Sequence, residues 1–365
     1  KGALKKTTDS HNFQRERLAI DLTQPIYHRQ YWVQLEQADK TIAQAESQYA
    51  GQEQDLMVRT AQAYFDVLSA KDELAFAESE NEAIKRQLEQ SKQRFEVGLI
   101  AVTDVFESQA RYDQSRANLI VARNKVNSAW EALYEIIEGS TLQRQVKTLA
   151  PLVEELPLQP PSPEDIEAWS NTAQQQNLLI QAALYGRDIA RQEIQVQRSG
   201  HYPTLDLVGS HSKDRGSRND AIEADNSRIG LQFVLPIYTG GAVSSLTRQA
   251  RKLLEAAQAQ LDGQRNQVNR QVRDAYRGVL DSISAVEAYK AGVASSESSL
   301  EATKAGFEVG TRTIIDVLGA ERDLFLARSK YATSRYLYIL AGLKLKQAAG
   351  SLSEEDIAAV SSLLK

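Results

Sequence analysis

The sequence predicts a mainly α-helical chain with a small β part, built from two internal copies of one unit. The tracts 26–150 and 237–365 contain no proline, which favours long helices because proline in a helix interior costs about 3 kcal/mol. Short motifs recur at an offset of 212 residues. Three short segments alternate apolar and polar residues with period two, which is typical of strands with one apolar face.

The composition excludes several classes of protein. The 365 residues include no cysteine, so disulfides, thiolate zinc sites and cysteine nucleophiles are ruled out. The 4 histidines leave little for a histidine-based metal site, and a formal net charge of -5 argues against a nucleic-acid binder. No apolar run of about 18 residues occurs, so no transmembrane helix is expected. We also expect no signal peptide in the opening residues of this sequence.

Three strands are expected. The first is centred on residues 18–22, the second on 202–207 and the third on 229–235, and the charged segment 210–228 is expected to form a hairpin loop. Three tyrosines lie at the strand ends that meet the helices: Tyr27, Tyr202 and Tyr238. Such strands with aromatic residues at one rim are typical of an outer-membrane β-barrel. A small half-buried sheet that caps a helical domain would show the same alternation.

Each copy is expected to hold a long helix, at 30–97 and at 241–309. Both helices end in the motif Phe-Glu-Val-Gly, so that Gly98 and Gly310 form the turns at the hairpin tips. The motif recurs at an offset of 212 residues, and too many other matches share this offset to arise by chance. We therefore interpret the two halves as copies of one unit.

A second, returning helix is expected after each tip. These helices open near Asp104 and Asp316, where an acidic side chain complements the helix dipole. Thr103 and Thr313 lie near the N-cap.

The returning helices carry a stripe in which large and small residues alternate at spacings of three and four. In the second copy the stripe is Val317, Ala320, Leu324, Ala327, Tyr331, Ser334, Tyr338, Ala341, Leu345 and Ala348. In the first copy it is Val105, Ser108, Tyr112, Ser115, Leu119, Ala122, Val126, Ala129, Leu133 and Ile136. Small residues let neighbouring backbones approach closely. The long helix of the second copy has its own seven-residue row, Val272, Val279, Val286, Val293, Leu300 and Phe307, and a sustained heptad implies supercoiling. The core of an antiparallel bundle would produce the same stripes.

Two further segments complete the chain. Five prolines fall within 151–163, so 139–163 is expected to be an irregular connector between the copies. A helix at about 165–198 precedes the second strand, and the first copy has no equivalent.

Four stretches of the sequence resemble the TolC-type family of outer-membrane efflux proteins. They are YFDVLSAKDELAFAESENEAIKRQLEQSKQRFEVGLIAVTDV at 64–105, GHYPTLDL at 200–207, LPIYTGG at 235–241 and AGFEVGTRTIIDVL at 305–318. The resemblance covers essentially the whole chain. It implies a homotrimer in which each protomer gives four strands to a shared twelve-stranded transmembrane barrel, continued by a long α-helical barrel, the tunnel.

The resemblance also implies a division of the chain. Residues 1–29 and 199–240 would form the barrel strands and extracellular loops, residues 30–138, 164–198 and 241–349 the periplasmic helical barrel, and residues 139–163 and 350–365 an equatorial connector. Only three strands are found where the family has four. We therefore expect an N-terminal helix and the first strand of the first copy, with a signal peptide before them, to be missing from this sequence.

In the family, bonds between side chains at the hairpin tips hold the periplasmic entrance closed. The resemblance implies that particular residues of this sequence make the same bonds. Arg312 would bond Thr103 and Asp104. Phe307 stands where the family has a tyrosine that also reaches this aspartate, so that link is expected to be missing because phenylalanine has no hydroxyl.

A further link joins the long helices in the family. Gln87 matches its glutamine, but the glutamate partner is replaced by Lys304. We expect this bond to be rearranged or lost.

Asp316 matches the first of two aspartates that ring the constriction in the family, and Gly319 replaces the second. Three carboxylates at a spacing of ~6 Å would repel one another by roughly 3 kcal/mol a pair at an effective dielectric of ~20. The entrance is therefore expected to prefer cations and to bind multivalent ones. A plain first-turn helix acid, like Asp104, is the alternative.

The implied function is a passive exit duct for drug-efflux pumps and type I secretion, opened by an iris-like movement of the hairpins. The expected partners are a periplasmic adaptor protein, an inner-membrane pump or ABC transporter, and outer-membrane lipid, without nucleic acid or cofactor. A coiled-coil scaffold or adhesin stalk would explain the helices but not the alternating strands. An enzyme has little support, since no nucleophile–base set, phosphate loop or metal cluster is apparent.

Overall fold

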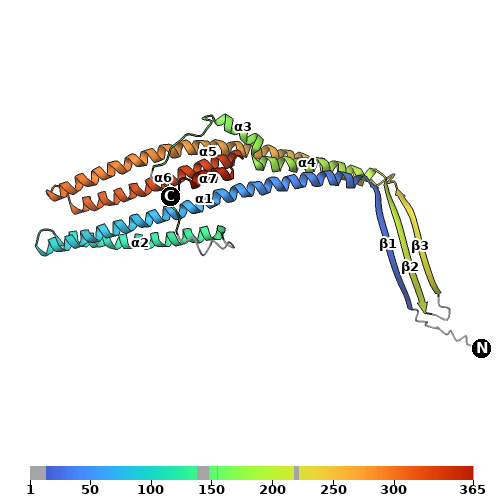
Figure 1. The fold of residues 1–365 in the computed structure, drawn as a ribbon, viewed down its shortest axis with the longest axis horizontal. Coiled ribbons are helices and arrows are strands. Elements are labelled where there is room, and N and C mark those ends of the chain that lie inside the picture. The colour runs from blue at the N-terminus through green and yellow to red at the C-terminus, as the bar shows by residue number, and fades with distance from the viewer. Residues whose placement is uncertain (1–13, 138–147, 154, 218–221, 365) are drawn as a thin grey trace, which may run out of the picture. The chain divides into compact units, whose positions relative to one another are not determined.

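The computed structural model describes residues 14–137, 148–153, 155–217 and 222–364, and this part of the chain is mainly helical (Figure 1). The predicted fold class, mainly α with a small β part, is confirmed. In chain order the elements are β1 (Gln14–His28), α1 (Arg29–Glu96), α2 (Val102–Ile137), α3 (Ile166–Gln176), α4 (Leu178–Arg198), the short 3-10 helix η1 (Ser199–His201), β2 (Thr204–Ser217), β3 (Ile222–Val234), α5 (Ala242–Glu308), α6 (Ile314–Ala349) and α7 (Glu354–Ser361).

The four long helices lie where the sequence predicts them. α1 has 68 residues and α5 has 67, while α2 and α6 have 36 each. Figure 1 shows α1 beside α2 and α5 beside α6, so the helices form two hairpins. Every residue of the two predicted stripes on α2 and α6 is buried or half-buried. The stripes are therefore the inner faces of the returning helices.

The helix predicted over 165–198 is interrupted. Asn177 separates α3 from α4 and has an extended backbone with ψ of 124°. Its Oδ1 accepts hydrogen bonds from the N–H groups of Leu179 at 3.0 Å and Ile180 at 3.3 Å, as an N-cap does. Its Nδ2 donates to the carbonyl of Ala348 at 2.9 Å. The side chain therefore caps α4 and ties it to the end of α6.

The strands form one antiparallel sheet in the order β1-β2-β3. The predicted alternation is confirmed, because the large apolar side chains share one face and are strongly exposed in the single chain. This face includes Leu18, Ile20, Leu22, Ile229, Leu231 and Phe233, which are 62–80% exposed. Pro25 lies in the edge strand β1 at a bulge, where no ladder hydrogen bond from its nitrogen is required.

The segment 210–228 is not a loop, and this prediction was wrong. β2 continues to Ser217 and β3 begins at Ile222, and residues 218–221 lie outside the described part of the chain. Lys213 pairs with Asp225 in the ladder, because backbone hydrogen bonds extend the sheet whatever the side chains are. Polar residues on both faces leave no period-two pattern to detect.

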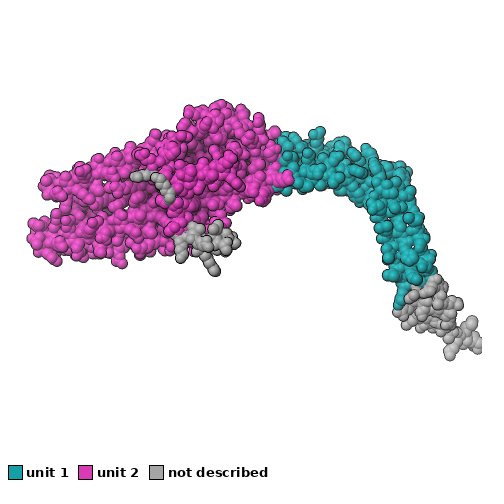
Figure 2. Space-filling view, viewed as in Figure 1, with its two compact units in different colours: residues 1–45, 182–261 teal, residues 46–181, 262–365 magenta. Residues whose placement is uncertain are grey.

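The chain forms two compact units (Figure 2). Unit 1 contains residues 1–45 and 182–261, so it holds the sheet and the helix ends next to it. Unit 2 contains residues 46–181 and 262–365, so it holds both hairpins and the connector. In the described part of the chain, no helix is long and apolar enough to cross a membrane.

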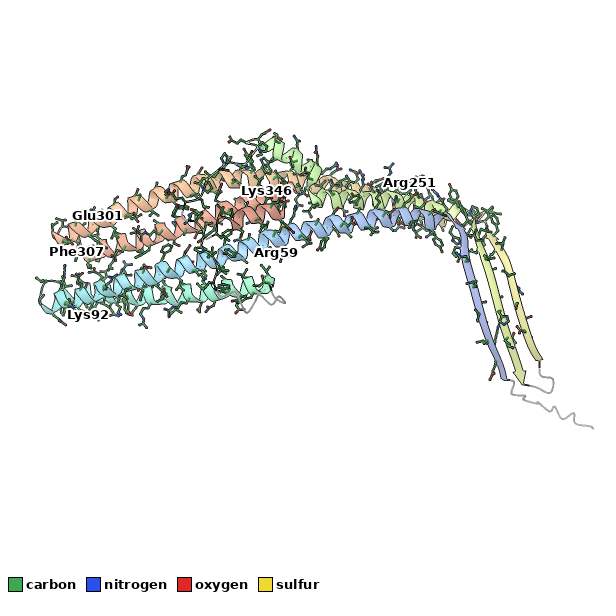
Figure 3. The ribbon with its side chains drawn as sticks, in the orientation of Figure 1. Arg59, Lys92, Arg251, Glu301, Phe307 and Lys346 are labelled. Atoms are coloured by element: carbon green, nitrogen blue, oxygen red, sulfur yellow. The ribbon has the colours of Figure 1, made fainter. Side chains whose placement is uncertain are left out.

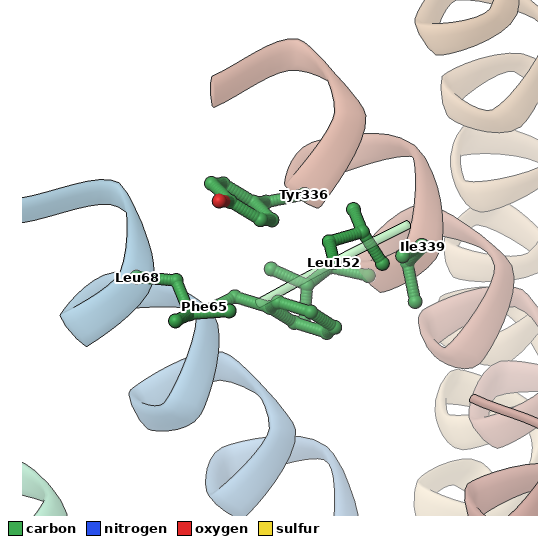
Figure 4. Close-up of a cluster of buried hydrophobic side chains, with 6 residues drawn as sticks. Phe65, Leu68, Leu152, Tyr336 and Ile339 are labelled. Atoms are coloured by element: carbon green, nitrogen blue, oxygen red, sulfur yellow. The ribbon is translucent and has the colours of Figure 1, made fainter. Parts of the chain in front are cut away.

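A buried cluster in unit 2 joins α1, α6 and the connector (Figure 4). Its members are Phe65, Leu68, Leu152, Tyr336, Ile339 and Leu340. The Tyr336 hydroxyl donates to Asp72 Oδ2 at 2.6 Å. Burial raises the pKa of Asp72 above its usual range, and the Tyr336 hydrogen bond opposes this shift.

The two segments predicted as connector meet beside this cluster. The N–H of Val153 donates to the carbonyl of Leu363 at 2.9 Å, and Leu152 forms a β-bridge with Leu364. Residues 139–147 and 154 of the predicted connector lie outside the described residues.

Candidate functional site

The two hairpins end in turns of the same geometry. Gly98 follows α1 with φ of +74°, and Gly310 follows α5 with φ of +79°. In the first turn the N–H of Leu99 donates to the carbonyl of Arg94, five residues earlier, at 2.9 Å; the matching bond in the second turn measures 2.8 Å. A positive φ favours glycine after a helix, so the motif Phe-Glu-Val-Gly ends both long helices in the same way.

Each hairpin is joined internally by polar pairs between its two helices. The pairs include Ser91–Ser108 at 3.1 Å, Asn81–Ser115 at 2.8 Å and Glu297–Arg328 at 2.6 Å. The serine pair is buried, and such short side chains allow close approach of the two helices. Polar side chains therefore join the two helices of each hairpin directly.

Towards their ends the two hairpins meet through apolar side chains. Ile84 of α1 is buried in one cluster with Ile314 and Leu318 of α6. Tyr112 of α2 and Phe307 of α5 are half-buried against this cluster. All four hairpin helices therefore contribute to this apolar cluster.

Phe307 makes a second contact between the hairpins. The guanidinium of Arg94, in the last turn of α1, lies 4.6 Å from the centre of the Phe307 ring, within the range of a cation–π interaction. Phe307 is labelled in Figure 3, at the end of α5. Sequence reasoning missed Arg94, because no local pattern relates residues on two different hairpins.

Gln87 and Lys304 line the same cleft of 440 Å³ between α1 and the second hairpin. They are not hydrogen-bonded to each other among the described residues. Lys304 Nζ instead lies 2.8 Å from a carboxylate oxygen of Glu321, which is only 14% exposed. Lys304 thus forms an ion pair within one hairpin, and Glu321 is a partner that sequence reasoning missed.

The predicted group of Arg312, Thr103 and Asp104 is not assembled within one described chain. Asp104 Oδ2 accepts a hydrogen bond from the N–H of Ala101 at 3.3 Å, so it caps its own helix. Thr103 lies inside the first turn of α2 rather than at the cap, and Arg312 has an exposed side chain in the second turn. No hydrogen bond or ion pair joins Arg312 to Thr103 or Asp104 among the described residues of one chain.

Asp316 forms a capping box with Thr313. Its Oδ2 accepts from the N–H and from the hydroxyl of Thr313, both at 2.8 Å, and its own N–H donates back at 3.3 Å. The backbone hydrogen bond first, and then the hydroxyl, hold the pKa of Asp316 below its usual range. Oδ1 has no hydrogen bond within the part of the chain that is described. Asp316 is thus a first-turn acid with one oxygen left for a ligand.

Gly319 lies one turn further along α6. A Cβ atom at this position would have no neighbour within 4 Å, so the site has room for the aspartate that the family places there. Across the described ranges, no cluster of three or more His, Cys, Asp or Glu side chains is arranged to hold a metal.

Comparison with known proteins gives one consistent result. Residues 2–139 and 169–351 match the model of a family described as outer membrane efflux protein. The chain is 42% identical to the outer membrane protein TolC of Vibrio cholerae over 351 residues, which cover 95% of this chain and 79% of that protein. It is 30% identical to the proteases secretion protein PrtF of Dickeya chrysanthemi, over 93% of this chain and 73% of that one.

The fold is also similar to solved structures. The crystal structure of the Campylobacter jejuni CmeC outer membrane channel superposes with a TM-score of 0.78 at 16% identity, over 97% of this chain and 82% of that chain. At this identity the likeness concerns the fold alone.

Proposed function

Because this chain belongs to the outer membrane efflux protein family, we propose that three copies assemble into one duct whose periplasmic entrance is gated at the hairpin ends. The protein is located in the outer membrane of a Gram-negative bacterium and extends into the periplasm. It is an exit duct for efflux and type I secretion.

The exposed sheet supports the trimer and its shared barrel. Large apolar side chains on one face are 62–80% exposed in the single chain, as lipid-facing positions of a barrel are. β1 and β3 each have one edge without a strand among the described residues, and sheet edges need a partner or cover. In the proposed trimer, strands from other copies would pair with the free edges of β1 and β3.

The proposed gating is based on the difference between the contacts within one hairpin and the contacts between the ends of the two hairpins. Within a hairpin the helices are joined by buried hydroxyls and ion pairs such as Lys304–Glu321, whereas the ends of the two hairpins meet through Phe307 and apolar side chains. The two hairpins would therefore separate from each other more easily than the two helices of one hairpin would. The duct is passive in this proposal, and the adaptor and the inner-membrane pump or ABC transporter supply the energy.

Two further elements are proposed for the assembled entrance. Arg312 of one copy would bond Thr103 and Asp104 of another, since these residues do not meet within one chain. Three Asp316 side chains would form a ring whose free oxygens face the axis and favour cations.

The absence of cysteine from the chain allows a direct test of the gating. Gln87→Cys and Lys304→Cys would be bridged across the cleft by a short bis-methanethiosulfonate reagent, and openings would be recorded in planar bilayers. We expect the bridge to abolish transitions to high conductance, and a reductant to restore them.

The matched control places the same bridge within one hairpin, between Lys304→Cys and Glu321→Cys. We expect it to leave the openings intact. Equal effects of the two bridges would contradict gating by separation of the hairpins. A cytosolic monomer in cell fractionation would instead favour the coiled-coil scaffold.

A further inference from the structure

A strongly basic pocket lies in unit 1, where α4 ends and α5 begins. It has a volume of 570 Å³ and is lined by Arg29, Arg198, Arg248 and Arg251 together with His201. Arg251 is labelled in Figure 3 on the first part of α5. No acidic side chain lines the pocket, so four permanent positive charges face one space in a protein whose formal net charge is -5.

These four arginines have no carboxylate partner within 4.0 Å in the part of the chain that the structure describes. Other arginines on α5 do have one: Arg273 is 2.6 Å from Glu167, and Arg277 is 2.6 Å from Asp274. The pocket therefore differs from an ordinary salt-bridged helix surface.

The acidic residues closest in sequence to Arg198 and Arg251 are already engaged. Glu193 accepts hydrogen bonds from Gln37 at 3.1 Å and Gln197 at 2.6 Å. Glu255 pairs with Lys252 at 2.9 Å. Because these carboxylates are held elsewhere, an external anion is the natural counter-charge for the pocket.

The chain brings the arginines together through a close helix contact. A Cβ atom on Gly200 would lie 2.9 Å from a methyl carbon of Val243, so only glycine lets η1 approach the first turn of α5 this closely. Arg198 is then carried next to α5. Arg248 and Arg251 are three residues apart and share one face of that helix.

We propose that this pocket binds a phosphate group, carried either by a lipid headgroup or by a soluble phosphate. Guanidinium groups match phosphate oxygens in a bidentate geometry, and Ser244 adds a hydroxyl group to the lining.

Two neighbouring residues favour a lipid headgroup as the carrier of the phosphate group. Tyr202 lines the pocket and is 51% exposed, and Leu205 on the apolar face of the sheet follows it by three residues. Aromatic residues mark membrane–water boundaries, and basic pockets beside membrane segments bind anionic headgroups. The proposal needs one chain only, so it does not depend on the gating proposed above.

The test compares two probes on the full chain purified in detergent. Inorganic phosphate is titrated by calorimetry, and phosphatidylglycerol is compared with diacylglycerol, which lacks phosphate, by native mass spectrometry. In the double variant Arg248→Gln, Arg251→Gln we expect binding of at least one phosphate probe to weaken by about tenfold or more. The single variant Arg251→Gln gives an intermediate loss if the double variant folds poorly by circular dichroism.

The charge-matched control is Lys252→Gln with Arg277→Gln, two cations of α5 that lie outside the pocket. We expect this control to leave binding unchanged. Weakened binding of phosphatidylglycerol alone would identify a lipid headgroup, and weakened binding of inorganic phosphate would identify a soluble anion. If the pocket and control variants bind both probes equally, the proposal is overturned.

Discussion

The contact between Arg94 and Phe307 gives the sharpest prediction about the gate. The variant Phe307→Leu keeps an apolar side chain against Ile84 and its neighbours but removes the face of the ring that attracts Arg94. A cation–π contact at a partly exposed site is worth about 0.5–1 kcal/mol. If three copies open together, the closed state loses about 1.5–3 kcal/mol, which raises the ratio of open to closed channels by about 10- to 150-fold.

The fraction of time spent open in planar bilayers measures this ratio directly. Arg94→Gln should raise it by a similar factor, and the double variant should add little, because either change already removes the contact. Lys92→Gln is the control, since it removes one positive charge from an exposed position two residues away. Unchanged open times for Phe307→Leu, or fully additive effects of the two changes, would refute the reasoning.

Three other predictions concern the entrance and the buried cluster. Thr313→Val removes the hydroxyl, one of the two donors that hold the pKa of Asp316 low, and keeps the backbone N–H, so cation selectivity, measured as a reversal potential, should be lost at a somewhat higher pH than in the parent. Gly319→Asp should strengthen cation selectivity and block by trivalent ions, because the site has room for the side chain, while Gly319→Ala should change neither. Tyr336→Phe should destabilise the fold by about 1–3 kcal/mol at neutral pH, because the partly buried carboxylate of Asp72 loses its donor. Since the pKa of Asp72 is already raised and would rise further, this deficit should shrink as pH falls towards the usual carboxyl range; urea unfolding at pH 4.5 and 7.5 would measure it.

The long helices could be predicted from the sequence because their causes are local. Proline-free tracts, the alternating stripes and the glycines at positive φ act over a few residues, and α1 and α5 lie within one residue of the predicted bounds. The outer parts of β2 and β3 could not be predicted. Their residues are polar on both faces, and pairing across the ladder rather than hydropathy extends the strands past Lys213.

The candidate site also has a part that could be predicted from the sequence and a part that could not. Gly98, Gly310 and the capping pair of Thr313 with Asp316 depend on neighbours along the chain, so the motifs locate them. Arg94 opposite Phe307 depends on how two hairpins lie side by side, which no spacing along the chain encodes. The substitution of Lys304 indicated a lost bond, but only the structure shows Glu321 as the new partner.

The buried cluster around Phe65 and Tyr336 also has a mechanical meaning. α1 runs from Phe65 to its end at Glu96 without interruption, a length of about 45 Å at 1.5 Å per residue. A rotation of about 10° around the cluster would carry the hairpin end by roughly 8 Å along this arm. If the hairpin turns there as one body during the proposed gating, it would act as a lever: a partner that pulls on the tip would need little force, and side chains near the pivot would set how far the tip travels.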